Sequence, residues 1–242
     1  MSRAVNEDYK KLVCFIENYS IHTAYDEEHL KKYIKPLHKS YFSVLTVMAE
    51  LIHQDAQPQS VFSDREKEEQ IDIFWQYLNE SISELGSSFF LILNGCYKAA
   101  EQVLRSSIEN FTKAHGSLDI KDIHKTKSVY TIFDLASNYS FFSDGVGKVF
   151  FKKLKILYGE LCSAVHTGAP KDMQAISALG DFPIMDSDRL ISTHNKYLEV
   201  VKIYVSSLTA LFVKNYHKMH HTNMDIISPL LTKDVINMLY PK

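Results

Sequence analysis

The sequence predicts an all-α protein, a multi-helix bundle built around a long central helix. Apolar residues recur every three or four positions along most of the 242 residues, which is the spacing of amphipathic helices. Only 8 Gly and 6 Pro are present, too few for a fold with many tight turns. No two strand-like segments flank a hairpin turn. These observations exclude an all-β architecture.

Composition and charge indicate an ordinary globular chain. Its hydrophobic content is 45% and its charged content 23%, and 27 basic residues nearly balance 29 acidic ones. We expect one domain over 1–242, with a core of about 64–221 and N-terminal helices at 4–55 packed on it. Nucleic-acid binding would need a local basic patch, because the net charge of -2 supplies no attractive field.

The cysteine and hydropathy patterns predict a cytoplasmic protein that does not enter a membrane. Three widely spaced cysteines form no disulfide framework. The N-terminal stretch lacks the apolar run of a signal peptide. The most apolar stretch, 89–96, is far too short to span a bilayer.

Two helices are predicted before residue 55. The first covers about 4–19, with an apolar side. The second covers about 27–54, and Pro36 lies inside it. Because proline has no N–H and its ring clashes with the preceding turn, Pro36 should kink or split this helix.

The longest predicted helix begins after Ser63, where Glu66 completes a capping-box pattern. Its periodicity reaches about His115, with an interruption predicted near Gly86. The apolar arc covers about half of the circumference between Ile82 and Ile108. An arc of that width predicts the central member of a bundle.

The second half of the chain alternates helices with polar segments. The predicted order is a polar loop over 115–127, a helix over 128–138, a helix over 148–165, an irregular segment over 172–186, a long helix over 187–220 and a short helix over 232–240. Gly168 and Pro170 supply the stop signal of the helix over 148–165.

Two lines of polar residues could carry chemistry. Glu101, Arg105 and Glu109 are spaced four residues apart on the central helix, either as a solvated ladder of ion pairs or as a polar seam with Arg105 available for a phosphate. Tyr158 and His166 follow the same spacing through Cys162. His166 is either a general acid/base or a histidine that bonds the last carbonyls of its helix.

The same residues resemble the HEPN superfamily. One helix reads Gly95, Ala99, Arg105 and Glu109, and a second ends in Tyr158, Leu161, Val165 and His166. The resemblance covers about 79–168. It implies a mostly dimeric module of four to five helices. Many members are metal-independent endoribonucleases of prokaryotic antiviral-defence or toxin-antitoxin systems, and others bind nucleotides, RNA or partner proteins without catalysis.

The chain departs from the family at the nuclease signature, in which an arginine precedes the histidine by four to six intervening residues. Gly159, Glu160 and Leu161 occupy those positions. If the site is catalytic, the resemblance makes His166 the general acid/base and Arg105 the phosphate-stabilising cation. Glu109 and Tyr158 would then support them, in a site formed between two protomers. Otherwise the domain is a binding-only member.

Lysines are the predicted contacts to nucleic acid. Lys148, Lys152 and Lys153 precede His166 on one helix, and Lys125 and Lys127 lie in the polar loop. Lysines interleaved with aromatic residues suit RNA phosphates and bases. The alternative interpretation is a solvated helix face.

No cofactor or metal site is predicted. His217 and His221 have a spacing that could hold a transition metal, but their position near a helix C-terminus is explanation enough. The sequence contains no phosphate-loop or dinucleotide motif. We therefore expect a protein that cleaves or binds RNA, as a homodimer and with a partner protein of a defence operon. The alternatives are a non-catalytic interaction subunit and a nucleotide sensor.

Overall fold

The structure, a computed structural model, describes residues 3–166, 170, 173–176 and 178–241. It describes side chains for these residues except 3–8, 64–65 and 164–166. Every regular element in the described ranges is helical, which confirms the all-α class. None of the helices in these ranges has the length and apolar character that crossing a bilayer requires.

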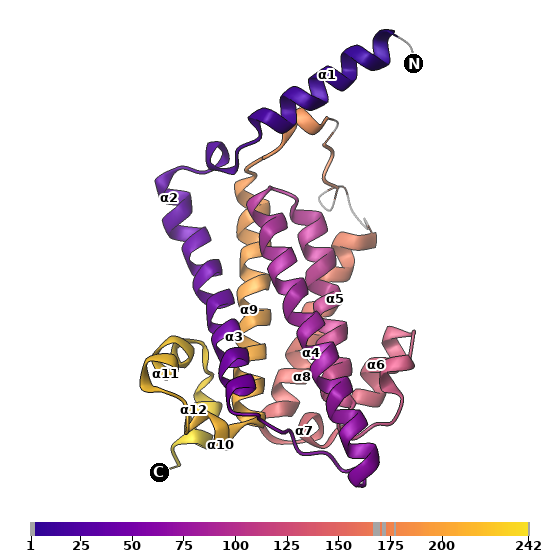
Figure 1. Cartoon of the computed structure of the whole chain (residues 1–242), viewed down its shortest axis with the longest axis vertical. Helices are drawn as coiled ribbons and strands as arrows, with labels where there is room; N and C mark the ends of the chain where they lie inside the picture. The colour runs from indigo at the N-terminus through magenta and orange to yellow at the C-terminus, as the bar shows by residue number, and fades with distance from the viewer. Residues whose placement is uncertain (1–2, 167–169, 171–172, 177, 242) are drawn as a thin grey trace.

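Five long helices form the bundle: α3 (Lys35–His53), α4 (Asp64–Leu93), α5 (Tyr97–Gly116), α8 (Gly145–His166) and α9 (Ser187–Leu211). Figure 1 shows α4 and α5 as an antiparallel hairpin, with α3 along one edge of the bundle. α8 packs against α5 and α9, and α3 packs against α9. The bundle therefore leaves one side of α3 and one side of α8 facing outward.

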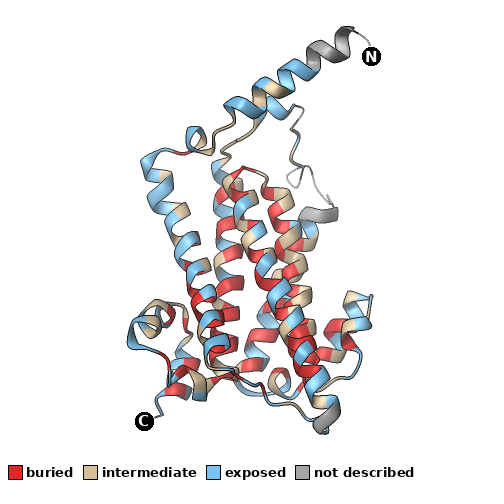
Figure 2. Ribbon diagram, viewed as in Figure 1, coloured by how far each residue is buried: buried red, intermediate tan, exposed pale blue. Residues whose placement is uncertain are grey.

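Aromatic side chains fill the centre of the bundle. Phe111 of α5 stacks on Tyr204 of α9 with ring centroids 3.8 Å apart. Tyr97, Tyr197 and Phe74 are also fully buried. Figure 2 shows the buried residues concentrated on the facing sides of α4, α5 and α9. Such rings supply large apolar areas, which accounts for a continuous core without disulfides.

The predicted single long helix over 64–115 is wrong, because the chain reverses at residues 94–96. Gly95 adopts φ 73°, a conformation that favours glycine, and ends α4. Gly86, where we predicted the interruption, lies inside α4 with the hydroxyl of Tyr41 packed over it. The central element is thus a hairpin of two helices.

The N-terminal region consists of α1 (Arg3–Asn18), a 3-10 turn (Ile21–Ala24), α2 (Glu27–His29) and a π-helical turn (Leu30–Ile34) that leads into α3. Helical residues run without a gap from Glu27 to His53, so Pro36 does not split the predicted helix; a π turn lies just before the proline, which sits in the first turn of α3. α1 projects from one end of the bundle (Figure 1).

Three short helical segments cover one end of α5 and α8. They are η3 (Ile123–Lys125), α6 (Val129–Ala136) and α7 (Ser140–Ser143). Ser128 caps α6 through its side chain, as the predicted helix start over 128–138 requires. A further 3-10 turn, η5 (Leu179–Asp181), interrupts the predicted irregular segment.

The C-terminal region differs from the prediction of one helix over 187–220. α9 ends at Leu211, and α10 (Val213–Tyr216), α11 (His221–Ile227), η6 (Ser228–Leu230) and α12 (Lys233–Leu239) follow. Phe212 leaves helical geometry and stacks on Trp75 at 5.9 Å between centroids, a tertiary contact that ends the helix. His217 and His221 therefore do not share one helix face.

Candidate functional site

Arg105, Glu109 and Tyr158 come together where α5 crosses α8, and we name them the Arg105 cluster. The Tyr158 hydroxyl donates a hydrogen bond of 2.8 Å to Glu109 Oε1. The Arg105 guanidinium carbon lies 5.5 Å from the centroid of the Tyr158 ring, a cation–π arrangement. Three of the four predicted catalytic residues thus meet within one chain.

Helix geometry explains how the cluster forms. Arg105 and Glu109 lie one turn apart on the side of α5 that borders α8. Tyr158 lies beside the buried stripe of α8, and its ring meets Phe133 of α6 edge-on at 5.0 Å. Packing therefore holds the tyrosine ring, and the ring holds the arginine over it.

The cluster contains an ion pair that is not a hydrogen bond. Arg105 Nε lies 3.6 Å from Glu109 Oε1, beyond the usual hydrogen-bond length. This Nε is buried and has no hydrogen-bond acceptor among the described residues. A buried donor without an acceptor costs free energy, so an anion that accepts from Arg105 would be favoured here.

Tyr158 acts as a proton donor within the cluster. Burial raises the pKa of its hydroxyl, and the hydrogen bond to the Glu109 carboxylate raises this pKa further. The phenol therefore stays neutral at physiological pH and cannot serve as a base. It can orient Glu109, which agrees with the supporting role predicted for it.

His166 is the last residue of α8, and its side chain lies outside the described residues. The helix carries its backbone eight residues past Tyr158, about 12 Å along the axis. The role of His166 as an acid/base stays a prediction.

Glu101 does not belong to the cluster, although the four-residue spacing aligns it with Arg105. Its carboxylate turns toward α9, where it accepts from Lys196 Nζ at 2.8 Å and Thr193 Oγ1 at 3.0 Å. Glu101 is buried, so the interpretation of the three residues as a solvated ladder is wrong at this position. Its ion pair ties α5 to α9.

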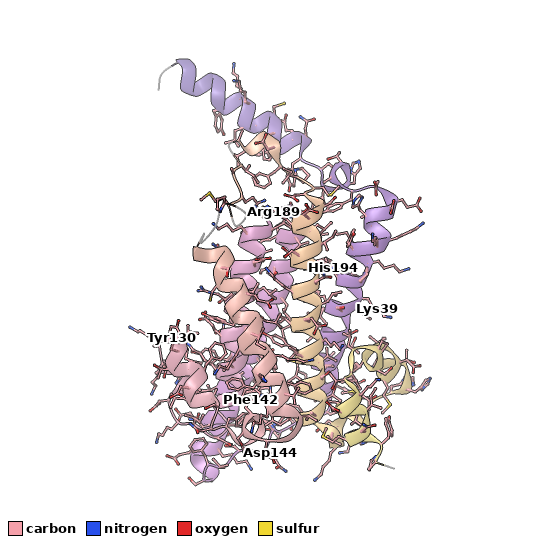
Figure 3. All side chains as sticks on the ribbon, turned by 180° about the vertical axis from the view of Figure 1, so that it is seen from behind. Lys39, Tyr130, Phe142, Asp144, Arg189 and His194 are labelled. Atoms are coloured by element: carbon pink, nitrogen blue, oxygen red, sulfur yellow. The ribbon has the colours of Figure 1, made fainter. Side chains whose placement is uncertain are left out.

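A row of lysines follows the outward side of α8. Lys148, Lys152 and Lys155, which we name the α8 lysine row, line a groove of about 530 Å³ together with Ser137, Phe142, Ser143, Phe151 and Ile156. None of the three makes an ion pair with a described residue. Figure 3 shows Phe142 and Asp144 at the foot of α8, where the groove lies.

The other predicted lysines are placed differently. Lys153 is exposed, and a helix turns 100° per residue, so it lies about 140° from Tyr158, away from the row. Lys125 pairs with Asp122 at 2.6 Å. Lys127 is exposed in the segment before α6. Of the five predicted lysines, Lys148 and Lys152 line the groove.

Glu84 of α4 is a polar group that the sequence interpretation missed. It accepts from Ser106 Oγ at 2.5 Å and from Asn110 Nδ2 at 2.9 Å, on the side of α5 next to the cluster. Burial raises the pKa of this carboxyl, although both hydrogen bonds oppose the shift. Only the α4–α5 hairpin brings it there, and a sequence interpreted as one continuous helix could not reveal that.

Among the described residues, no three of His, Cys, Asp or Glu are grouped as a metal site would require. Compared with protein-family models, with curated proteins and with solved structures, the chain matches none.

Proposed function

We propose that this chain is a HEPN-like protein of a prokaryotic antiviral-defence or toxin-type system, and that it binds RNA through the outward side of α8 and the Arg105 cluster. The observation that carries the proposal is the α8 lysine row, three lysines that pair with no described carboxylate and lead toward an arginine whose buried Nε has no described acceptor. Cleavage of the bound RNA is the second part of the proposal and depends on His166.

Helical geometry supports a continuous binding surface. With 100° of turn per residue, Lys155 lies about 60° from Tyr158 around the α8 axis, Lys148 about 80° and Lys152 about 120°. All three are on the same side of the tyrosine, and ten residues from 148 to 158 rise about 15 Å. That length suits two or three phosphates of one extended strand.

The chemistry of the cluster suits phosphate recognition. Arg105 offers a planar set of donors, and its Nε is buried without an acceptor among the described residues. Tyr158 keeps Glu109 engaged, which limits how strongly Glu109 competes for the guanidinium. A phosphate at this point would lie beside α8, on which His166 lies two turns further along.

A binding experiment tests the first part. Fluorescence anisotropy with a labelled single-stranded RNA would compare the wild type with Lys152→Gln and its neighbour Lys153→Gln. Both lysines are exposed on α8 and neither has an ion pair with a described residue, so they form a matched pair. We expect Lys152→Gln to weaken binding about three- to tenfold and Lys153→Gln to change it less than twofold. Equal losses would contradict the surface, and no binding by the wild type would contradict the function.

A cleavage assay tests the second part. Wild type and His166→Ala would be incubated with tRNA and total RNA in the presence of a chelator. We expect strand breaks only with the wild type, because a nuclease of this kind needs a proton carrier. Equal damage by both proteins would exclude this role for His166. RNA binding without cleavage by the wild type would make the chain a binding-only member.

A non-catalytic interaction subunit is the second candidate. The hydrogen bond between Tyr158 and Glu109 favours it, since a hydroxyl and a carboxylate that satisfy each other can be structural. On this alternative, Arg105→Gln would lower the free energy of unfolding and leave RNA binding unchanged. On the first proposal the same substitution weakens RNA binding at least fivefold.

A further inference from the structure

The outer side of α3 carries an apolar stripe that no part of the described chain covers. Phe42, Leu45, Ala49 and Ile52 form this α3 stripe. Phe42 is 48% exposed, Leu45 38% and Ile52 65%, and Ala49 is also exposed. Figure 2 shows α3 exposed along its outer edge and buried toward the bundle. Single exposed apolar residues are common, but a contiguous line of them marks an interaction surface.

The spacing of the α3 stripe indicates what covers it. Its members follow one another at intervals of three, four and three residues, the heptad pattern with which two helices pair side by side. The opposite side of α3 buries Leu37, Val44 and Leu51 in the core. The helix therefore has two apolar sides, and only the inner one has a partner within the described chain. The expected occupant of the outer side is another helix with a heptad stripe.

We propose that the α3 stripe pairs with the same stripe of a second copy of this chain, with the two helices antiparallel. Charges beside the stripe select this arrangement. Lys35 and Lys39 lie toward its N-terminal end, and Asp55 lies just past its C-terminal end, whereas Glu50 is already held by Asn223 of α11 and by Gln54. Antiparallel pairing places the lysines of one copy near Asp55 of the other, whereas parallel pairing places like charges together. The helix dipoles also favour the antiparallel orientation, because they then point in opposite directions.

The residue sizes fit a twofold axis between the copies. An axis near residue 47 sets Leu45 against Ala49 of the second copy, a large side chain against a small one. It also sets Phe42 against Ile52 of the second copy. Because the interface is isologous, each contact occurs twice. The side chains of the stripe therefore fit those of a second stripe that runs in the opposite direction.

The size of the surface predicts a reversible dimer. Three large side chains from each copy, burying roughly 100 Å² each, account for about 600 Å² of apolar surface. Stable interfaces bury roughly 1,200–2,000 Å², so this contact belongs among weak or transient ones. We expect association to appear at micromolar concentrations and to be independent of RNA.

Sedimentation velocity over roughly 1 to 200 µM tests the proposal. The substitution Leu45→Glu places a charge in the stripe, and Leu12→Glu on α1 is its matched control, because Leu12 is 37% exposed. The wild type and Leu12→Glu should dimerise alike, and Leu45→Glu should raise the dissociation constant at least tenfold. Circular dichroism would establish that both variants keep the helical fold. A wild type that stays monomeric, or a loss of the dimer only in Leu12→Glu, would overturn the proposal.

Cross-linking tests the orientation. In the variant Leu45→Cys/Ala49→Cys, mild oxidation should link Cys at position 45 of one copy to position 49 of the other, as identified by peptide mass. Links that join position 45 to 45 and 49 to 49 would overturn the antiparallel arrangement. This outcome and the sedimentation result do not depend on RNA, so they can fail while the proposed function stands.

Discussion

Tyr158 connects the two helices of the candidate site through a single hydroxyl. Its ring lies beside the Arg105 guanidinium and meets Phe133 edge-on, and its hydrogen bond to Glu109 spans 2.8 Å. A hydrogen bond to a carboxylate is stronger than one between neutral groups. The hydroxyl, more than the ring, therefore determines where Glu109 lies.

The variant Tyr158→Phe keeps the ring and removes the hydroxyl. We expect the free energy of unfolding to fall by about 1–2 kcal/mol, measured by urea denaturation, because the half-buried Glu109 loses its donor. Tyr130→Phe is the control, since Tyr130 is 92% exposed on α6 (Figure 3), and it should change stability by less than about 0.5 kcal/mol. Equal effects of the two substitutions would show that the hydrogen bond contributes nothing.

His115 is a buried histidine inside an aromatic box. Its ring lies 4.5 Å from Phe111, 5.0 Å from Phe142 and 5.8 Å from Phe74, between centroids. Its Nδ1 has no hydrogen-bond partner among the described residues. Burial lowers the pKa of this imidazole to about 3, so the folded protein keeps it neutral.

The lowered pKa of His115 makes stability depend on pH. The imidazole takes up a proton near pH 6.5 in the unfolded chain and only near pH 3 in the folded chain. Above pH 6.5 the residue therefore does not reduce the free energy of unfolding, and between pH 6.5 and pH 3 protonation of the unfolded chain lowers it progressively. From pH 7 to pH 5 the free energy of unfolding should drop by about 2 kcal/mol through this residue. Urea denaturation of His115→Leu at both pH values should show a drop smaller by that amount. An identical drop in wild type and variant would contradict the assignment.

At the scale of helices, the sequence predicted the type of each element better than its ends. The periodicity identifies the helices that became α1, α6, α8 and α12. It cannot locate the reversal between α4 and α5, because Gly86 and Gly95 both lie in an unbroken apolar pattern. A tertiary contact decides between the two glycines. The carbonyl oxygen of Ile184 lies 1.9 Å from the position that a Cβ on residue 95 would occupy, so only glycine fits there.

Gly95→Ala and Gly159→Ala should have opposite effects on stability. An alanine at 95 must adopt positive φ and displace the Ile184 carbonyl, so we expect a loss of at least about 2 kcal/mol. Gly159 lies on the exposed side of α8 with no atom within 4 Å of a new Cβ, and alanine there should add about 0.5–1 kcal/mol. Thermal unfolding of both variants measures the difference. A stable Gly95→Ala would contradict the reversal at this residue.

The candidate site was predictable where it depends on local spacing and not where it depends on packing. Arg105 and Glu109 share a helix face by their spacing alone, and the resemblance added Tyr158. Glu101 has the same spacing but turns toward Lys196, and Glu84 comes next to the cluster, bound to Ser106 and Asn110, only through the hairpin. Which of several equally spaced carboxylates meets which neighbour is fixed by the contacts between helices.

At the scale of the whole molecule, the two proposed surfaces lie on opposite edges of the bundle. Figure 3 shows Lys39 on the outer edge of α3 and Tyr130 on the far side, beyond α8. A dimer formed through the α3 stripe would therefore leave both α8 lysine rows open to solvent. RNA sites at the two ends of such a dimer would act separately, in contrast to the single shared site that the resemblance implies.

Salt dependence measures how many cations the proposed RNA surface uses. For single-stranded RNA, the logarithm of the association constant falls with the logarithm of salt concentration by about 0.7 per phosphate neutralised. The two or three phosphates that the three lysines and Arg105 can neutralise should therefore give a slope of roughly -1.4 to -2.1 between roughly 50 and 300 mM KCl. Substituting all three lysines by Gln should reduce the slope to about -0.7, since Arg105 remains. Because the net charge of the chain is only -2, a steep slope in the wild type must come from a local surface. A slope that the triple substitution leaves unchanged would place the RNA elsewhere on the molecule.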